Sequence, residues 1–266
     1  MMAPFTKALH AACKGHSHPH ATFDLSKETM AAVWMMRVLL VLSEVLDRDF
    51  TRAFESFELR DRPATWVIEY DASLMGLAII WFEIEPDGAE VAVGCGAVDL
   101  RNKGYENSGL MNTLELMAAT VGLWKLKERG VRNAAIRVRG DNMTAMEWAE
   151  NRGFRSEYAQ KTAIAFTAIS VESGLEVVDK EHLPHTRKYD NNWRTDKPSR
   201  HEMTWDEVKE GDKRDTITGS RLGEEMEEWD METASYLCEM CDPMEERRTD
   251  EFVVKKMLEM TGWGEE

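Results

Sequence analysis

Four acidic residues stand far apart in this sequence, each within a short phrase of its own. The acids are Asp71, Glu115, Asp141 and Asp196, in the phrases YDAS, NTLEL, RGDN and NNWRTDKPSR. Carboxylate oxygens are ligands that Mg²⁺ prefers, and one or two per ion suffice because the ion keeps several waters. Two such ions about 3.5–4 Å apart can assist hydrolysis of a phosphodiester. A fold that gathers these acids is therefore predicted to bind two Mg²⁺ ions, with Mn²⁺ as an alternative.

Each acid also has a local explanation that needs no cation. An aspartate at a strand end is commonly a turn or cap residue. Glu115 could complete a capping box with Asn112 at the start of a helix. Asp196 lies beside Arg194 and Lys197 and could belong to a solvated face. The prediction of a shared site therefore depends on all four acids occurring together in matching elements.

The segments around the acids predict strands and helices in a definite order. Three strand candidates lie close together, with a turn signal at Pro86-Asp87-Gly88 between the second and the third, and they indicate an antiparallel meander. The predicted elements are strands at 66–73, 76–85 and 90–100, a helix at about 112–128 ended by Gly130, a strand at 133–140, helices at 144–153 and 156–174, a strand at 175–182 and a short helix around 192–200. This order describes a mixed α/β layer fold.

Length and composition set the class of the protein. The chain of 266 residues has room for one ordinary domain plus sizeable additions. No apolar stretch reaches the roughly 18–20 residues of a membrane span, and the N-terminus lacks a signal-peptide pattern. Four cysteines in a chain of this length suggest a reducing compartment. We therefore expect an intracellular protein, cytoplasmic or nuclear, without a membrane partner.

The negative charge is concentrated at the C-terminal end. The net charge of −16 divides into 0 for residues 1–63, −3 for 64–200 and −13 for 201–266. The central segment, which holds all four acids, is therefore nearly balanced, and the total charge does not argue against a nucleic-acid substrate.

Three segments follow from these patterns. Residues 1–63 are expected to be a helical segment, with Ser26 capping a helix from about Lys27 to Leu46. Residues 64–200 are expected to be the α/β domain. Residues 201–266 contain no long strand candidate and are expected to be an acidic tail, helical or disordered, that could bind a protein partner.

The phrases around the acids resemble the ribonuclease H domain of retrotransposon reverse transcriptases, especially the gypsy-like and tyrosine-recombinase element types. The match covers about half of the chain, and 1–63 is weakly similar to the connection segment before that domain. The matching phrases are Asp71-Ala72-Ser73 with Gly76 (DAS-x-x-G), Asn112 to Leu116 (N-x-x-E-L) and Asp141-Asn142 with Ala145 (DN-x-x-A). Asn192 to Arg200 is similar to the closing phrase N-x-x-A-D-x-L-S-R, with Thr195 and Pro198 in place of its Ala and Leu. The resemblance implies a ribonuclease H-like, mixed five-stranded sheet with flanking helices.

The resemblance also implies a reaction and further site residues. The expected activity is endonucleolytic hydrolysis of the RNA strand of an RNA–DNA hybrid by two metal ions. His182 matches a loop histidine that assists proton transfer or product release, with His185 as the second candidate. The polar neighbours Ser73, Asn112 and Asn142 are candidates for contacting the substrate. Five basic residues could contact phosphates or simply balance local acids: Arg187, Lys188, Arg194, Lys197 and Arg200.

Two other functions stay open on sequence alone. The chain could be a non-catalytic interaction module that keeps a ribonuclease H-like scaffold, with the acidic tail as its binding segment. It could also be a DNA-cutting nuclease of the integrase or resolvase type on the same fold. Cleavage of an RNA–DNA hybrid that depends on Mg²⁺ and on Asp71 would distinguish the ribonuclease H activity from both of these alternatives.

Overall fold

The computed structural model describes residues 62–151, 158–183, 192–212 and 220–244. The helical segment predicted for 1–63 lies outside these residues apart from its last two positions, and so does the end of the acidic tail, 245–266. His185, Arg187 and Lys188 are also outside them. Within the described part, no helix is long and apolar enough to cross a membrane.

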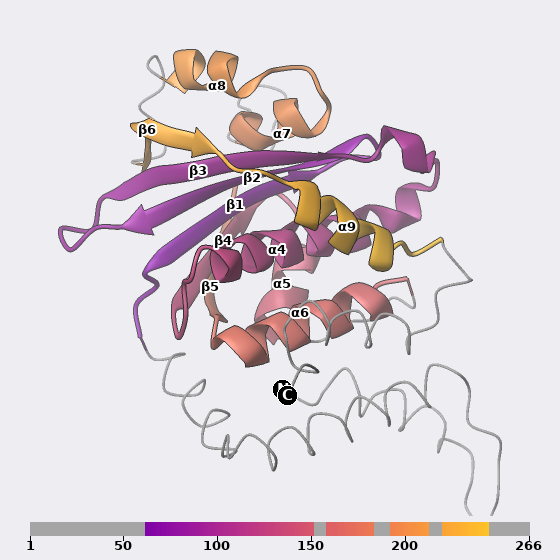
Figure 1. Ribbon diagram of the computed structural model, residues 1–266, viewed down its shortest axis with the longest axis horizontal. Helices are drawn as coiled ribbons and strands as arrows, with labels where there is room; N and C mark the ends of the chain where they lie inside the picture. Colours follow the sequence, from indigo (N-terminus) through magenta and orange to yellow (C-terminus); the bar gives the residue numbers. More distant parts are fainter. Residues whose placement is uncertain (1–61, 152–157, 184–191, 213–219, 245–266) are drawn as a thin grey trace, which may run out of the picture.

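A six-stranded sheet with the strand order β5-β4-β1-β2-β3-β6 forms the centre of the described fold (Figure 1). The strands are β1 (Trp66–Ala72), β2 (Gly76–Ile84), β3 (Glu90–Asp99), β4 (Ala135–Gly140), β5 (Glu176–His182) and β6 (Ser220–Glu228). The first three strands pair antiparallel, which confirms the predicted meander. β4 pairs parallel with β1, β5 with β4, and β6 with β3.

Turn chemistry fixes the meander. In the β2–β3 turn, Gly88 has a φ of +87°, which glycine adopts without strain, and Asp87 accepts a hydrogen bond from the N–H of Ala89 at 2.9 Å. In the β1–β2 turn, the Ser73 hydroxyl accepts hydrogen bonds from the N–H groups of Met75 and Gly76 at 3.0 and 3.1 Å. The tight β1–β2 turn leaves the site residue Asp71 close to the end of its strand.

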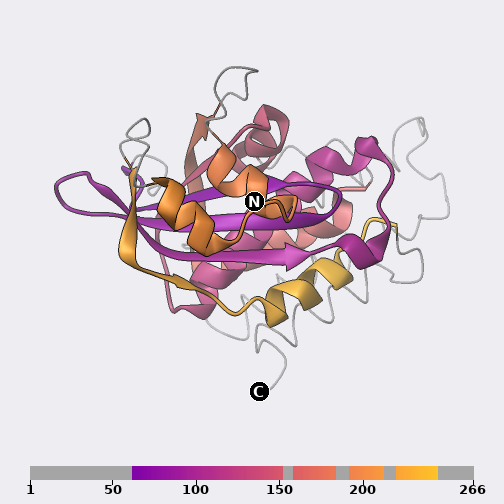
Figure 2. The same ribbon diagram turned by 90° about the horizontal axis from the view of Figure 1, so that it is seen from above.

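Helices cover both faces of the sheet (Figures 1 and 2). One face carries α4 (Met111–Glu128), α5 (Met143–Asn151), α6 (Gln160–Ser173) and α9 (Glu232–Met240), and the other carries α7 (Trp193–Ser199) and α8 (Trp205–Asp212). Short 3-10 helices at Arg101–Lys103 and Ser108–Leu110 connect β3 to α4. Alternate side chains of β1 divide between the layers, since Ile68 and Tyr70 join the larger core around α4 and Val67 joins the smaller core beneath α8.

The start of α4 differs from the prediction. The helix begins at Met111, after the 3-10 turn, and no side chain caps it. Asn112 therefore lies inside the first turn, and the predicted capping box with Glu115 is wrong. The predicted end is confirmed, because α4 stops at Glu128 and Gly130 follows with a φ of +84°.

Two expectations about the sheet and the tail need correction. Within the described residues the sheet has six strands where five were expected, and the sixth comes from the acidic segment that was expected to be helical or disordered. The segment packs closely: Trp229, directly after β6, stacks on Trp81 with ring centroids 4.3 Å apart. A Cβ atom at Gly94 of β3 would lie 2.1 Å from the Trp229 ring, so only glycine leaves room for it. The sequence SRLGEEMEE has little strand propensity of its own, and its pairing with β3 depends on this tertiary contact.

Candidate metal centre

Three of the four predicted acids meet at one end of the sheet. Asp71 lies near the end of β1, Asp141 directly follows β4, and Glu115 reaches in from α4, and one oxygen of each lies within 4.8 Å of the others. The strands β1 and β4 are parallel neighbours, so their carboxyl ends meet at the same edge. Gly140 helps this approach, because a Cβ there would lie 3.0 Å from the carbonyl oxygen of Tyr70.

The group is buried and electrostatically unfavourable without a cation. Asp71 and Glu115 are only 2% and 3% exposed. Burial, ahead of the charges of Asp71 and Asp141, raises the pKa of Glu115 well above its ordinary range. The N–H of Ala72 hydrogen-bonds to the Glu115 carboxylate, but its Oε2 atom is buried with no hydrogen-bond partner among the described residues. A buried carboxylate with an unpartnered oxygen, close to two further carboxylates, fits a hard divalent cation.

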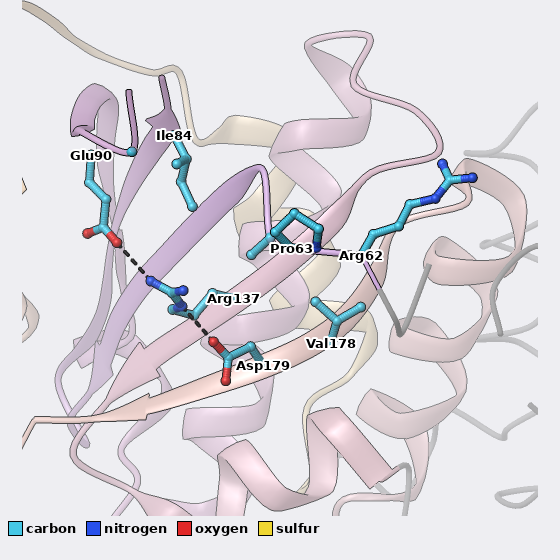
Figure 3. A pocket seen from close by; sticks show the side chains of 9 residues that line it. Arg62, Pro63, Ile84, Glu90, Arg137, Val178 and Asp179 are labelled. Carbon is cyan, nitrogen blue, oxygen red and sulfur yellow. Dashed lines mark hydrogen bonds and ion pairs between the residues drawn. The ribbon is translucent and has the colours of Figure 1, made fainter. Parts of the chain in front are cut away.

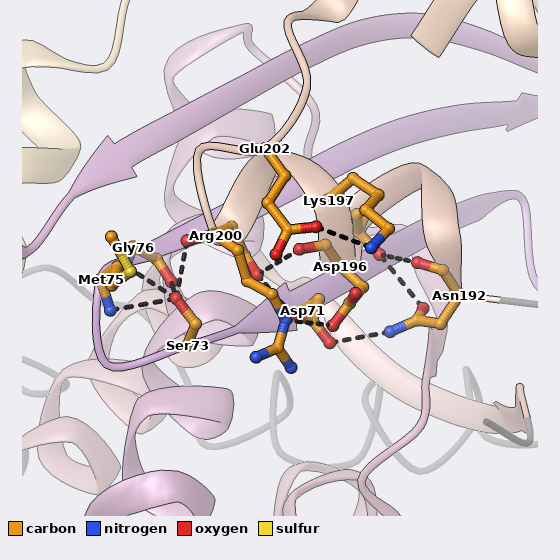
Figure 4. Close-up of polar contacts among 11 residues, drawn as sticks. Asp71, Ser73, Met75, Gly76, Asn192, Asp196, Lys197, Arg200 and Glu202 are labelled. Carbon is orange, nitrogen blue, oxygen red and sulfur yellow. Dashed lines mark hydrogen bonds and ion pairs between the residues drawn. The ribbon is translucent and has the colours of Figure 1, made fainter. Parts of the chain in front are cut away.

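The closing motif on α7 holds the carboxylate of Asp71 from both sides (Figure 4). The Asn192 side-chain amide donates to Oδ1 of Asp71 at 2.8 Å, and the Ser199 hydroxyl donates to Oδ2 at 2.6 Å. These two donors are seven residues apart, which is two helical turns, so they face the same side. Gly76 makes room for this contact, since a Cβ there would lie 2.9 Å from the carbonyl oxygen of Ser199. Both donors belong to the closing motif of the sequence, but that motif alone predicted no contact of either with Asp71.

Asp196 approaches the group without joining it. It lies on α7 between the two donors, is 6% exposed, and its charge raises the pKa of Asp71. Its Oδ1 accepts a hydrogen bond from Nε of Arg200 at 2.7 Å. The site therefore consists of a three-carboxylate group and a fourth, ion-paired carboxylate on the α7 side of Asp71.

His182 lies at the edge of the site. It is the last residue of β5, its side chain is exposed, and its Nε2 is 3.0 Å from the backbone oxygen of Asp141. As a donor to that carbonyl, the ring is held beside the carboxylate group rather than in it. His185, the second candidate, lies outside the described residues.

The three polar residues proposed to contact substrate all border the acids, and each makes an internal hydrogen bond. Ser73 donates to the carbonyl oxygen of Ser199 at 2.7 Å. Asn142 donates to Oδ1 of Asn112 at 2.9 Å and accepts from the N–H of Ala145 at 3.0 Å, which caps α5. These bonds tie the β1–β2 turn to α7 and α4 to α5, so the three residues at least brace the site, and their contact with substrate stays a prediction.

The basic residues on α7 balance local charges. Arg194 is 2% exposed and donates to the side chain and backbone oxygens of Ser220 at 3.0 and 3.3 Å. Lys197 pairs with Glu202 at 2.7 Å, and Arg200 pairs with Asp196. Lys197 and Arg200 therefore balance nearby acids, whereas Arg194 bonds to Ser220 and its charge opposes the burial that raises the pKa of Glu69; contact of these residues with phosphates stays a prediction.

A separate pocket lies at the opposite end of β1 (Figure 3). It has a volume of about 410 Å³ and is lined by residues that include Arg62 and Pro63 before β1. Within it, Arg137 pairs with Glu90 at 2.9 Å and with Asp179 at 2.8 Å. None of the predicted site residues lines this pocket, so it is separate from the carboxylate group.

Comparisons with known proteins add little to this geometry. No protein-family model and no curated protein matches the chain. Among solved structures, the chain is similar to ribonuclease H1 from the halophilic archaeon Halobacterium salinarum, at 17% identity and a TM-score of 0.35. The similarity covers 52% of this chain and 94% of that chain. At this level the functional assignment depends on the carboxylates themselves.

Proposed function

We propose that this chain is a metal-dependent endonuclease of the ribonuclease H type that hydrolyses the RNA strand of RNA–DNA hybrids. The observation that carries the proposal is the buried group of Asp71, Glu115 and Asp141, which includes an unpartnered oxygen of Glu115 within the described residues. The order of elements from β1 to α7, which is the order predicted from the sequence, also supports it. The four motifs are the reason for proposing a retrotransposon reverse transcriptase as the origin.

In the proposed mechanism the acids would hold two divalent cations, Mg²⁺ or Mn²⁺, which would supply the Lewis acidity that phosphodiester hydrolysis needs. Asp71 would be a ligand of both cations, since the charges of Asp141 and Asp196 both act on it. Asn192 and Ser199 fix the orientation of its two oxygens, as outer hydrogen bonds commonly do for metal ligands. The products would carry a 3′-hydroxyl and a 5′-phosphate.

His182 is proposed to move a proton during the reaction or product release. Its imidazole is exposed at the edge of the site and its hydrogen bond to the Asp141 backbone keeps it there. Ser73, Asn112 and Asn142 are proposed to border the minor groove of the hybrid, where 2′-hydroxyls distinguish RNA from DNA.

Cleavage of a labelled RNA–DNA hybrid in Mg²⁺ tests the proposal. The wild type should cut the RNA strand, and Asp71→Asn should lower the rate by at least about a hundredfold because a shared ligand loses its charge. Asp179→Asn is a matched control, since its carboxylate is half-exposed on β5 and pairs with Arg137 beside the other pocket. This control should cut at the wild-type rate.

Two other outcomes of this experiment would favour the two alternative functions. Cutting of duplex DNA but not of the hybrid would favour the DNA-cutting nuclease. Absence of cutting from a folded wild-type protein in both Mg²⁺ and Mn²⁺ would contradict the nuclease and favour the non-catalytic scaffold.

A further inference from the structure

The two halves of the carboxylate site differ in how their oxygens are occupied. On one side of Asp71, Glu115 keeps a buried oxygen with no hydrogen-bond partner in the described part of the chain. On the other side, Asp196 already has a positive partner, because Nε of Arg200 donates to its Oδ1 at 2.7 Å (Figure 4). A cation can therefore enter the first half directly but meets an existing ion pair in the second.

The Arg200 side chain can leave this ion pair without disturbing the helix. Arg200 is the C-cap residue directly after α7, four positions after Asp196, and its side chain is 50% exposed whereas that of Asp196 is 8% exposed. A half-exposed guanidinium on a flexible stem can rotate into water, while the carboxylate stays fixed in the helix. Arg200 is thus the mobile member of the pair.

The guanidinium also acts on the shared ligand. Its positive charge partly offsets the repulsion that Asp71 receives from Asp141 and Asp196. A divalent cation between Asp71 and Asp196 would supply the same kind of charge in the same place. The arginine and that cation therefore compete for one function, the neutralisation of the α7 side of the site.

We infer that Arg200 is a built-in competitor of the second cation, so that two divalent cations bind in a set order and with unequal affinity. The inference rests on the proposed two-cation function. The first ion binds the group of Asp71, Glu115 and Asp141, and the second binds between Asp71 and Asp196 only after Arg200 has released its carboxylate. Arg200 is thus a positioning residue that regulates the occupancy of the site.

Direct binding of Mn²⁺ to the full chain, without nucleic acid, tests the inference. Calorimetry and the electron paramagnetic resonance signal of free Mn²⁺ should resolve a tighter and a weaker site in the wild type. Arg200→Gln should tighten the weaker site about fivefold, the effect expected of removing one charge at a partly exposed position, and leave the tighter one unchanged. Arg200→Lys keeps the charge and should remain close to the wild type, whereas Asp196→Asn should remove the weaker site.

Lys197→Gln is the matched control. It removes one positive charge from the same helix, but the charge of Lys197 is paired with the exposed Glu202. If Arg200→Gln and Lys197→Gln tightened Mn²⁺ binding at the weaker site equally, the cause would be the change in overall charge, and the inference would be overturned. Unchanged binding in Arg200→Gln, in a protein that still binds two ions, would overturn it while leaving the nuclease proposal intact. A wild type that binds no Mn²⁺ would instead defeat the proposed function itself.

Discussion

The hydrogen bonds of α7 and the charges of the neighbouring acids both act on the carboxylate of Asp71. It accepts hydrogen bonds from Asn192 and Ser199, and it faces the negative charges of Asp141 and Asp196. Burial is the largest of these influences and, with the neighbouring acids, raises the pKa of Asp71 from 3.8 to about 7. Binding of the proposed cation and binding of a proton would thus be alternatives at this residue.

The raised pKa predicts how stability depends on pH. The folded protein holds this proton more tightly than the unfolded chain, so without metal Asp71 should lower the free energy of unfolding as the pH rises from about 4 to about 7. Added Mg²⁺ should raise the Tm at about pH 8 but hardly at about pH 5. The Tm of the wild type and of Asp71→Asn, each with and without Mg²⁺, measures this. If the Tm of the two proteins changed with pH in the same way, the assignment of the raised pKa to Asp71 would be contradicted.

The hydrogen bond from Ser199 predicts a graded loss of activity. In Ser199→Ala, Oδ2 of Asp71 loses a donor and its orientation, and loss of such an outer contact commonly costs about 10- to 100-fold in activity or metal affinity. The rate of hybrid cleavage measures the loss. Ser173→Ala is the control, since it removes another buried helical hydroxyl, bonded to Ile169 on α6, and should leave the rate unchanged.

At the scale of the elements, a buried ion network lies next to the carboxylate site. Its members Glu69, Arg139 and Arg194 each precede one of the site acids by two residues. Arg139 is 2% exposed and pairs with Glu69, Glu90 and Glu181 at 3.5, 2.5 and 2.6 Å. Because residues two apart in a strand share a face, the network fixes the register of β1 and β4 beneath the acids.

This network predicts that the loss of the Arg139 charge and the loss of the Glu69 charge have unequal effects on the free energy of unfolding. Arg139→Met leaves Glu69, which is completely buried, without its direct ion pair and, among the described residues, with only the positive charge of Arg194 acting on it, and should lower the free energy of unfolding by about 3–5 kcal/mol. Glu69→Gln should cost far less, because Arg139 keeps Glu90 and Glu181 and burial already raises the pKa of Glu69. Urea unfolding measures both.

A neighbouring arginine provides the comparison for Arg139. Arg137 lies on the same strand and also forms two ion pairs, but its side chain is 29% exposed. Arg137→Met should therefore cost only about 1 kcal/mol or less. Equal losses in the two arginine variants would show that burial of the network contributes nothing.

At the scale of the whole molecule, the C-terminal segment is part of the described fold. β6 extends the sheet at β3, and α9 packs against α4. The segment 201–266 carries a net charge of −13, of which only −3 lies in 245–266, outside the described residues. Deletion of 201–266 would therefore expose the β3 edge as well as remove charge. Removal of 245–266 alone is the cleaner way to ask whether the acidic end limits nonspecific binding of nucleic acid or binds a protein partner.

The contact of Trp229 with β3 predicts the effect of glycine substitutions. Gly94→Ala places a methyl group against a fixed indole ring and should lower the free energy of unfolding by about 1–3 kcal/mol. Gly96→Ala meets the side chain of Met231, which can move, so its cost should be smaller. Urea unfolding measures both, and Trp229→Ala should cancel most of the penalty of Gly94→Ala in a double variant. Additive losses would contradict the proposed steric cause.

Local patterns in the sequence were sufficient for the strands of the meander, the end of α4 and the acids themselves. Strand alternation, turn residues and a terminal glycine act over a few positions, so they can be recognised without a fold. The tertiary structure decided the rest. The pairing of β1 with β4 brings Asp71 and Asp141 together, and α7 adds the bonds of Asn192 and Ser199. β6 was missed because its acidic sequence forms a strand only where β3 and Trp81 supply partners from more than 100 residues away.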